Sequence, residues 1–115
     1  RHQNALKYTT RLSAVPQVQT PRIRENAFHI FHLYVIRTPK RDELAGHLKS
    51  RNIETGIHYP RALPFLKAYE YLGHRPSDFP IAFRYQNEIL SLPMFPELND
   101  AQIDHVAGSI MEFYR

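Results

Sequence analysis

Residues 28–37 constrain the fold of this chain more than any other segment. The segment reads Phe-His-Ile-Phe-His-Leu-Tyr-Val-Ile-Arg, an almost continuous apolar run that is rich in aromatic and β-branched side chains. Such side chains pack well on a pleated sheet, and a run with little polar alternation is typical of a strand that is covered on both faces. The segment therefore predicts a central strand, with a sheet as the centre of the fold.

A helix is predicted directly after this strand, over residues 40–51. Thr38 can cap its first turn, and a proline follows the threonine. Leu44 and Leu48 are one helical turn apart, so they form a narrow apolar stripe that can lie on a sheet. Asn52 suits the left-handed residue that ends such a helix.

A second strong helix signal lies near the C-terminal end of the chain. Asn99 and Gln102 approximate a capping box, and Leu98 can pack onto Ile103. The helix that follows has one apolar face, which consists of Ile103, Val106, Ala107, Ile110 and Met111. Residues 93–96, Pro-Met-Phe-Pro, cannot form regular structure and predict a rigid corner before this helix.

The elements between these two helices are short. Residues 53–58 predict a second strand that returns the chain to the sheet, and residues 89–92 predict a third strand. Residues 65–72 predict a short helix closed by Gly73, and residues 80–88 predict another helix with a proline in its first turn.

The N-terminal part of the chain predicts a helix and an edge segment. Four apolar side chains fall near helical spacing, namely Ala5, Leu6, Tyr8 and Leu12. Prolines bracket residues 17–20, which suits an edge strand. We interpret residues 1–27 as the end of a connecting helix plus this edge segment, and residues 28–115 as a small domain. The predicted fold class is α+β, a small, mostly antiparallel sheet with helices packed on it.

Composition limits the class of protein. A chain of 115 residues with 43% hydrophobic and 23% charged residues is typical of one globular domain. No run approaches the ~20 apolar residues that a membrane span needs. The absence of cysteine excludes disulfides and thiolate metal sites and fits a reducing compartment. The net charge of +4 comes from scattered basic residues, so we expect neither a nucleic-acid nor a membrane partner.

The first residues of the chain also carry information. They read Arg-His-Gln-Asn, without a methionine, and the helical spacing begins without a capping residue. We therefore expect this chain to be a piece of a longer polypeptide.

The strongest candidate for a functional segment is residues 55–60, Thr-Gly-Ile-His-Tyr-Pro. The predicted strand ends here at a proline and presents the imidazole of His58 beside the phenol of Tyr59. A strand end that carries a titratable ring and a phenol is a common place for one wall of a site. A structural hydrogen bond is an equally good interpretation of His58. Because successive side chains on a strand point to opposite faces, only one of the two can face a given pocket.

No catalytic residue and no metal ligand are predicted elsewhere in the chain. His29 and His32 are three positions apart on the predicted strand, so they point to opposite faces and cannot bind one ion together. We expect His32 in the core or in an interface. Arg37 and Arg61 could bind a phosphate or a carboxylate, although a solvated surface position is favoured for both. The chain has no Gly-rich phosphate loop or nucleophile elbow, and no lysine is expected in an apolar pocket suited to Schiff-base chemistry.

Five segments, in order along the chain, resemble a known family. They are His-Leu-Tyr-Val-Ile-Arg at 32–37, Arg-Asp-Glu-Leu at 41–44, Thr-Gly-Ile-His-Tyr-Pro at 55–60, Asp-Phe-Pro at 78–80 and Leu-Ser-Leu-Pro-Met-Phe-Pro-Glu-Leu at 90–98. Together they look like the C-terminal portion of the DegT/DnrJ/StrS family, the pyridoxal-phosphate-dependent sugar-nucleotide aminotransferases. Each segment alone is a weak signal, and their order and spacing over residues 28–115 carry the resemblance.

The resemblance implies a fold type I aminotransferase, a cytoplasmic homodimer with a large cofactor domain and a smaller C-terminal domain. Glutamate would give its amino group to pyridoxal 5'-phosphate, which passes it to a ketone on a nucleotide-linked deoxysugar. The Schiff-base lysine and most phosphate contacts of that family belong to the upstream domain. No cofactor-binding residue is therefore assigned to this chain, which is expected to be inactive alone. By the same analogy, His58 and Tyr59 contact the substrate. Asn52 stands where the family often has glycine, and it preserves the left-handed turn.

Two other classes of protein remain as alternatives. One is a free-standing basic α+β binding module, for example for RNA, although the chain lacks the paired aromatic strands and Gly-rich loop of such modules. The other is a structural dimerisation domain. Salt-dependent binding of oligonucleotides would favour the first, and sedimentation of the chain would test the second.

Overall fold

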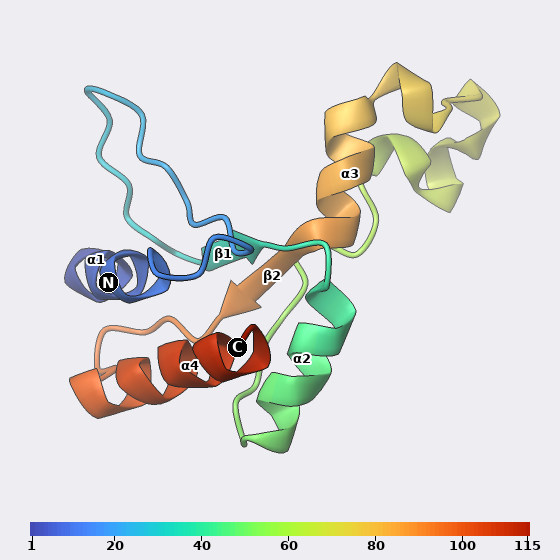
Figure 1. The fold of residues 1–115 in the computed structure, drawn as a ribbon. Helices are drawn as coiled ribbons and strands as arrows, with labels where there is room; N and C mark the ends of the chain where they lie inside the picture. The colour runs from blue at the N-terminus through green and yellow to red at the C-terminus, as the bar shows by residue number, and fades with distance from the viewer.

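A two-stranded antiparallel sheet lies at the centre of the molecule (Figure 1), in a computed structural model that describes residues 1–115. Strand β1, Tyr34–Arg37, pairs along its whole length with strand β2, Ile89–Leu92. In this register the buried Tyr34 lies opposite Leu92. The prediction of an α+β fold with a small antiparallel sheet is confirmed.

Single bridges extend the sheet at both of its edges. Gln19 pairs with Arg37 beside β1, as the predicted edge segment requires, and Gly56 pairs with Ser91 beside β2. Both bridges are antiparallel. Four short segments, far apart in the sequence, therefore lie side by side.

Four α-helices and three 3₁₀ helices connect these strands. The α-helices are α1 (His2–Leu12), α2 (Arg41–Ser50), α3 (Pro80–Glu88) and α4 (Asp100–Phe113), and the 3₁₀ helices are η1 (Leu63–Phe65), η2 (Lys67–Leu72) and η3 (Pro76–Asp78). Helix α4 packs against both α1 and α2. Figure 1 shows α3 and the 3₁₀ helices projecting away from the sheet and from these three helices. None of the helices combines the length and apolar character that a membrane crossing requires.

The hydrophobic core contains 18 buried apolar residues, and none of them belongs to α3 or to a 3₁₀ helix. Tyr8 and Tyr34 are fully buried, with ring centres 5.0 Å apart. The Tyr8 hydroxyl donates to the carbonyl oxygen of Pro93 at 3.0 Å, and the Tyr34 hydroxyl bonds to the Thr9 hydroxyl at 2.8 Å. Both phenols therefore keep a partner inside the core. Leu6, predicted on the same face as Tyr8, is instead 48% exposed because it lies two positions away around the helix.

The predicted strand over residues 28–37 is wrong in its first six residues. Phe28 is 76% exposed, and only the last four residues of the segment form β1. Phe31 adopts a left-handed φ of 49°, and its N–H donates to Nδ1 of His29 at 2.9 Å, so the backbone leaves the extended conformation there. The partner strand also stops before Pro93, which has no N–H to donate to a longer ladder.

Three smaller predictions also differ from the structure. Residues 53–58 do not form a regular strand, because only one bridge joins them to β2. His32 does not lie in the core, because the chain has turned before β1 and leaves it exposed, and its place in an interface stays a prediction. Lys40, not Thr38, occupies the position before α2. The Thr38 hydroxyl is buried, bonds to the hydroxyl of Tyr114 and also accepts the N–H of Lys40 at 3.4 Å.

The signals for the ends of helices are largely confirmed. Asn52 has a left-handed φ of 61°, and Gly73 closes η2 with a φ of 68°. Asn99 accepts the N–H of Gln102 at 2.9 Å, and the Gln102 side chain accepts the N–H of Asn99 at 3.0 Å, which completes the capping box. Residues 65–72 differ in type and in continuity, since Phe65 ends η1, Leu66 is extended and Lys67–Leu72 form η2, both 3₁₀ helices.

Candidate functional site

His58 is held at the edge of the sheet by the neighbouring strand. Gly56 exchanges two backbone hydrogen bonds with Ser91, of 3.0 and 2.7 Å. This pairing brings the side chain of His58, two residues further on, against β2. Its Nδ1 atom lies 2.8 Å from Oγ of Ser91. Because Ser91 is only 4% exposed, the hydroxyl is a fixed anchor for the imidazole ring.

Gly56 makes this ring position sterically possible. A Cβ atom at position 56 would lie 2.6 Å from Cε1 of His58, closer than real Cβ contacts allow. The missing side chain therefore lets the imidazole lie directly over the backbone. Glycine is required at position 56 because the imidazole lies so close to the backbone, and not because of an unusual backbone φ.

The second ring nitrogen of His58, Nε2, makes no hydrogen bond within the protein, and the residue is exposed. When Ser91 donates to Nδ1, the neutral ring carries its proton on Nε2 and offers a donor. When Nδ1 donates to Ser91, Nε2 is an acceptor. In both tautomers one nitrogen is oriented by the protein and the other can bind a ligand.

Tyr59 lies beside His58 on the surface. The two rings meet edge to face, with centres 5.6 Å apart, and the peptide bond between the residues is cis. Tyr59 is 73% exposed and lines a hollow of about 540 Å³. The hollow is mostly apolar, and its other walls include Leu63, Leu66 and Tyr85. Both predicted residues are thus accessible, and Tyr59 adjoins a hollow of the size that small ligands occupy.

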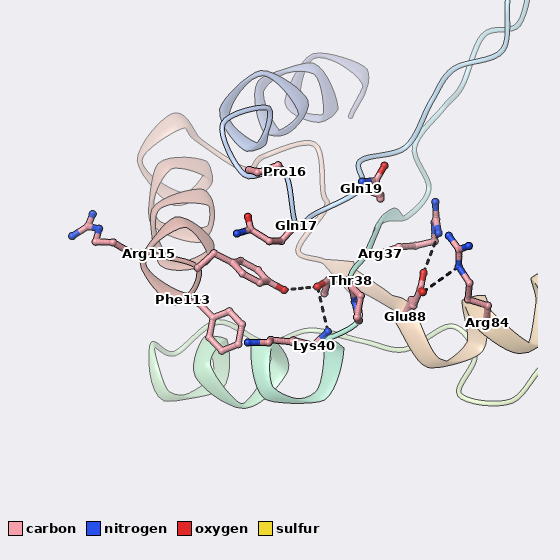
Figure 2. A pocket seen from close by; sticks show the side chains of 12 residues that line it. Pro16, Gln17, Gln19, Arg37, Thr38, Lys40, Arg84, Glu88, Phe113 and Arg115 are labelled. Atoms are coloured by element: carbon pink, nitrogen blue, oxygen red, sulfur yellow. Dashed lines mark hydrogen bonds and ion pairs between the residues drawn. The ribbon is translucent and has the colours of Figure 1, made fainter.

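Arg37 and Arg61, the two arginines with a predicted anion-binding alternative, differ in their surroundings. Nη1 of Arg37 lies 3.0 Å from a carboxylate oxygen of Glu88, and the guanidinium group lies 4.0 Å above the Tyr85 ring. Figure 2 shows Arg37 and Arg84 converging on Glu88. Arg37 therefore pairs with a carboxylate of the protein itself. Arg61 is exposed at the wall of the Tyr59 hollow and makes no ion pair.

Several residues that build this region were missed in the sequence. The sequence marks Ser91 only as part of a strand, because its contact with His58 depends on a register that the sequence does not give. The sequence marks Arg41 only as the first residue of the Arg-Asp-Glu-Leu segment. It is 7% exposed, and its Nη1 donates to the carbonyl oxygens of Gln86 (3.2 Å) and Ile89 (3.0 Å), where α3 meets β2. No local pattern marks such a buried arginine.

The histidines and acidic residues do not gather into a cluster. No three side chains of His, Asp or Glu come together in a way that could hold a metal ion. His47 bonds to the carbonyl oxygen of Ser109, and His105 bonds to that of Arg51, each at 3.0 Å.

The lysines do not offer an aldehyde cofactor a suitable amine. Lys7 is ion-paired with Asp100, and Lys40, Lys49 and Lys67 are exposed. Schiff-base lysines are usually desolvated or placed beside another cation in a pocket. None of the four lysines therefore has the surroundings that are usual for a Schiff-base lysine.

The sequence and the fold of this chain both match known proteins. Residues 1–111 match the DegT/DnrJ/EryC1/StrS aminotransferase family. The chain is 41% identical over its whole length to a "pleiotropic regulatory protein" of Geobacillus stearothermophilus. It is 32% identical, over 95% of its length, to a dTDP-3-amino-3,4,6-trideoxy-alpha-D-glucose transaminase of Streptomyces venezuelae. The matched regions are only 32% and 29% of those two proteins, so the chain spans about a third of its relatives.

Solved structures agree with the sequence relatives. The fold superimposes on DesV of S. venezuelae, crystallised in complex with a ketimine intermediate, with a TM-score of 0.94 and 30% identity. That match covers 99% of this chain and 31% of DesV. A DegT DnrJ EryC1 StrS aminotransferase from Brucella abortus gives a TM-score of 0.88 with 28% identity, over 98% of this chain and 30% of that one.

Proposed function

Because this chain belongs to the DegT/DnrJ/EryC1/StrS aminotransferase family, we propose that it is the C-terminal part of a pyridoxal-phosphate-dependent sugar aminotransferase. The match of 111 of its residues to the family is the observation that carries this proposal. The fold supports it, since the chain superimposes almost completely on about a third of DesV. The family match favours this function over a free-standing binding module or a structural dimerisation domain. Residues 28–115 form the small domain, and residues 1–27 connect to it.

Pyridoxal phosphate would supply the electron-withdrawing ring that makes amino-group transfer possible. The four lysines of this chain are exposed or ion-paired, so its own residues do not fit the covalent site of the cofactor. We assign that site to polypeptide outside the chain and expect residues 1–115 to be inactive alone. Treatment of the chain with pyridoxal phosphate and borohydride should give no specific, stoichiometric lysine adduct. Such an adduct would contradict the assignment.

His58 and Tyr59 form a wall for the acceptor in this proposal. The anchored imidazole presents Nε2 to a hydroxyl or phosphoryl oxygen of a nucleotide-linked keto-deoxysugar. The exposed ring of Tyr59 offers a flat face and a hydroxyl beside an apolar hollow, which suits a deoxysugar with its few hydroxyl groups. The two residues bind and orient the acceptor and do no chemistry themselves. Glutamate is the amino donor, and it does not need this wall.

Residues 59–88, which we call the α3 lobe, support a homodimer. None of its residues is buried. Its exposed large apolar side chains are Tyr59, Leu63, Tyr69, Tyr71, Leu72, Phe79, Ile81, Phe83 and Tyr85. Such a gathering of exposed apolar groups is typical of an interaction surface. We propose that the full-length enzyme is a cytoplasmic homodimer, a location that the absence of cysteine supports.

The decisive experiment compares two half-reactions of the full-length enzyme. His58→Ala should weaken use of the keto-sugar about tenfold or more, because it removes a hydrogen bond and part of the acceptor wall. The glutamate half-reaction should change less than twofold. His105→Ala, at an exposed histidine on α4, is the matched control and should leave both unchanged. Equal losses in both half-reactions for His58→Ala would show that His58 has a structural role.

A further inference from the structure

The segment over residues 57–61, which carries His58 and Tyr59, is held at few points. None of its residues makes a backbone–backbone hydrogen bond, and no helix or strand includes them. Just before the segment, Gly56 is paired with Ser91, and the imidazole of His58 bonds to the Ser91 hydroxyl. The position of Tyr59 and of the residues after it therefore depends on how the other end of the segment is fixed.

Gln86 fixes that other end. The N–H of Ala62 donates to Oε1 of Gln86 at 2.8 Å, across 24 positions of the sequence. Because a backbone N–H can only donate, the carboxamide oxygen must face Ala62, and this sets the orientation of the amide group. Gln86 and Ala62 both line the hollow beside Tyr59. The hydrogen bond thus closes the segment at the residue that precedes η1.

Gln86 is itself fixed to the body of the fold. It lies in the last turn of α3, which leads directly into β2. Nη1 of the buried Arg41 donates to the backbone carbonyl oxygen of Gln86 at 3.2 Å and to that of Ile89 at 3.0 Å. Arg37 pairs with Glu88 of the same turn at 3.0 Å. A side chain that extends from a turn held in this way is a firm partner for the segment.

We propose that Gln86 is a positioning residue for the acceptor wall. With a strand-paired residue at one end and the Gln86–Ala62 hydrogen bond at the other, the His58–Tyr59 pair is held between two fixed points. A wall of fixed shape loses less conformational freedom on binding than a loose one, so the hydrogen bond should improve affinity for the acceptor. Gln86 acts through the backbone of Ala62 and not by chemistry of its own. The inference rests on the proposed function of the wall.

Two substitutions at position 86 separate the hydrogen bond from the size of the side chain. In the full-length enzyme, Gln86→Leu keeps a similar volume and removes the acceptor, whereas Gln86→Glu keeps an oxygen that can accept the Ala62 N–H. Gln, Leu and Glu have similar helix propensities, so α3 should stay intact in both variants. Gln3→Leu, at an exposed glutamine of α1, is the matched control.

Two measurements, made at physiological ionic strength to screen the charge that Gln86→Glu adds, read the result. Hydrogen–deuterium exchange at the Ala62 amide should become about fivefold faster in Gln86→Leu. The KM for the keto-sugar should also rise about fivefold in this variant, with kcat changed less than twofold and the glutamate half-reaction unchanged. Gln86→Glu and Gln3→Leu should stay within twofold of the parent in both measurements. A general loss of stability would not spare kcat and the glutamate half-reaction.

Three outcomes would overturn the inference. They are unchanged exchange at Ala62 in Gln86→Leu, equal losses in Gln86→Leu and Gln86→Glu, and faster exchange in Gln86→Leu with an unchanged KM for the keto-sugar. In the third case, His58→Ala shows which proposal fails. If it impairs use of the keto-sugar, the acceptor wall stands and only the role of Gln86 is wrong. If it does not, the proposed function of the wall is wrong as well.

Discussion

The imidazole of His58 and the hydroxyl of Ser91 meet at 2.8 Å across the edge of the sheet, although 33 positions separate them in the sequence. Ser91 is buried in β2, whereas His58 lies on the surface. One end of the ring is therefore fixed to the core, and the other end faces solvent. This geometry converts a flexible surface histidine into an oriented hydrogen-bonding group.

Removing the Ser91 hydroxyl should free the imidazole of His58 from its fixed orientation and leave the ring itself in place. In the full-length enzyme, Ser91→Ala should raise the KM for the keto-sugar about fivefold, because the ring gains freedom that binding must then restrict. The glutamate half-reaction should be unchanged. In a His58→Ala background, Ser91→Ala should have no further effect on the keto-sugar, since the two residues act as a unit. Additive losses in this double-mutant cycle would show that Ser91 acts through another contact.

A side chain at Gly56 should displace His58. Gly56→Ala places a Cβ atom 2.6 Å from Cε1 of the imidazole, so the ring must leave its position over the backbone. We expect a loss in the keto-sugar half-reaction as large as that of His58→Ala. Gly46→Ala, within α2 and with no atom within 4 Å of the new Cβ, is the control. It should stabilise the protein by about 0.5–1 kcal/mol in urea unfolding. An unchanged keto-sugar KM in Gly56→Ala would contradict the described ring position.

The capping box of α4 should contribute measurably to stability. Asn99→Ala removes the acceptor for the Gln102 N–H, and the free energy of unfolding should fall by about 1 kcal/mol. Asn99→Asp keeps an acceptor at the helix N-terminus and should lose much less. Urea unfolding of the chain measures both. A similar loss in both variants would mean that the cap hydrogen bond is not the cause.

Stability should decrease at high pH because of buried phenols. Burial raises the pKa of Tyr34 to about 12, whereas in the unfolded chain it ionises near 10. The stability that the neutral, buried phenol contributes is complete below pH 10 and is lost as the pH rises from 10 to 12, by about 1.4 kcal/mol per pH unit. Burial and the neighbouring Tyr34 also raise the pKa of Tyr8, which adds to the effect.

Comparison with Tyr34→Phe isolates this contribution. The variant loses a hydrogen bond to Thr9 and should be less stable at pH 8. Its urea midpoint should nevertheless fall less steeply than that of the parent between pH 10 and 12. Parallel slopes for the two proteins would show that Tyr34 does not ionise on unfolding in this range.

Much of the fold follows from local sequence signals. The Asn99–Gln102 capping box, the left-handed Asn52 and the apolar stripe of Leu44 and Leu48 depend on contacts within a turn or two, so a short window of sequence contains the information. The order of the five family segments likewise indicates the class of protein. The segment over residues 55–60 predicts that His58 and Tyr59 lie at an accessible edge.

Other features arise only when distant segments meet. The apolar run over residues 28–33 has strand-like composition, but its backbone turns at Phe31 and no partner strand extends beyond Leu92. Ser91 becomes the anchor of His58 only through the bridge to Gly56, and Arg41 is buried only because α3 ends against it. Composition and periodicity determined which segments could be helix or strand. Register and packing between distant segments decided which side chains touch, because those contacts depend on the path of the whole chain.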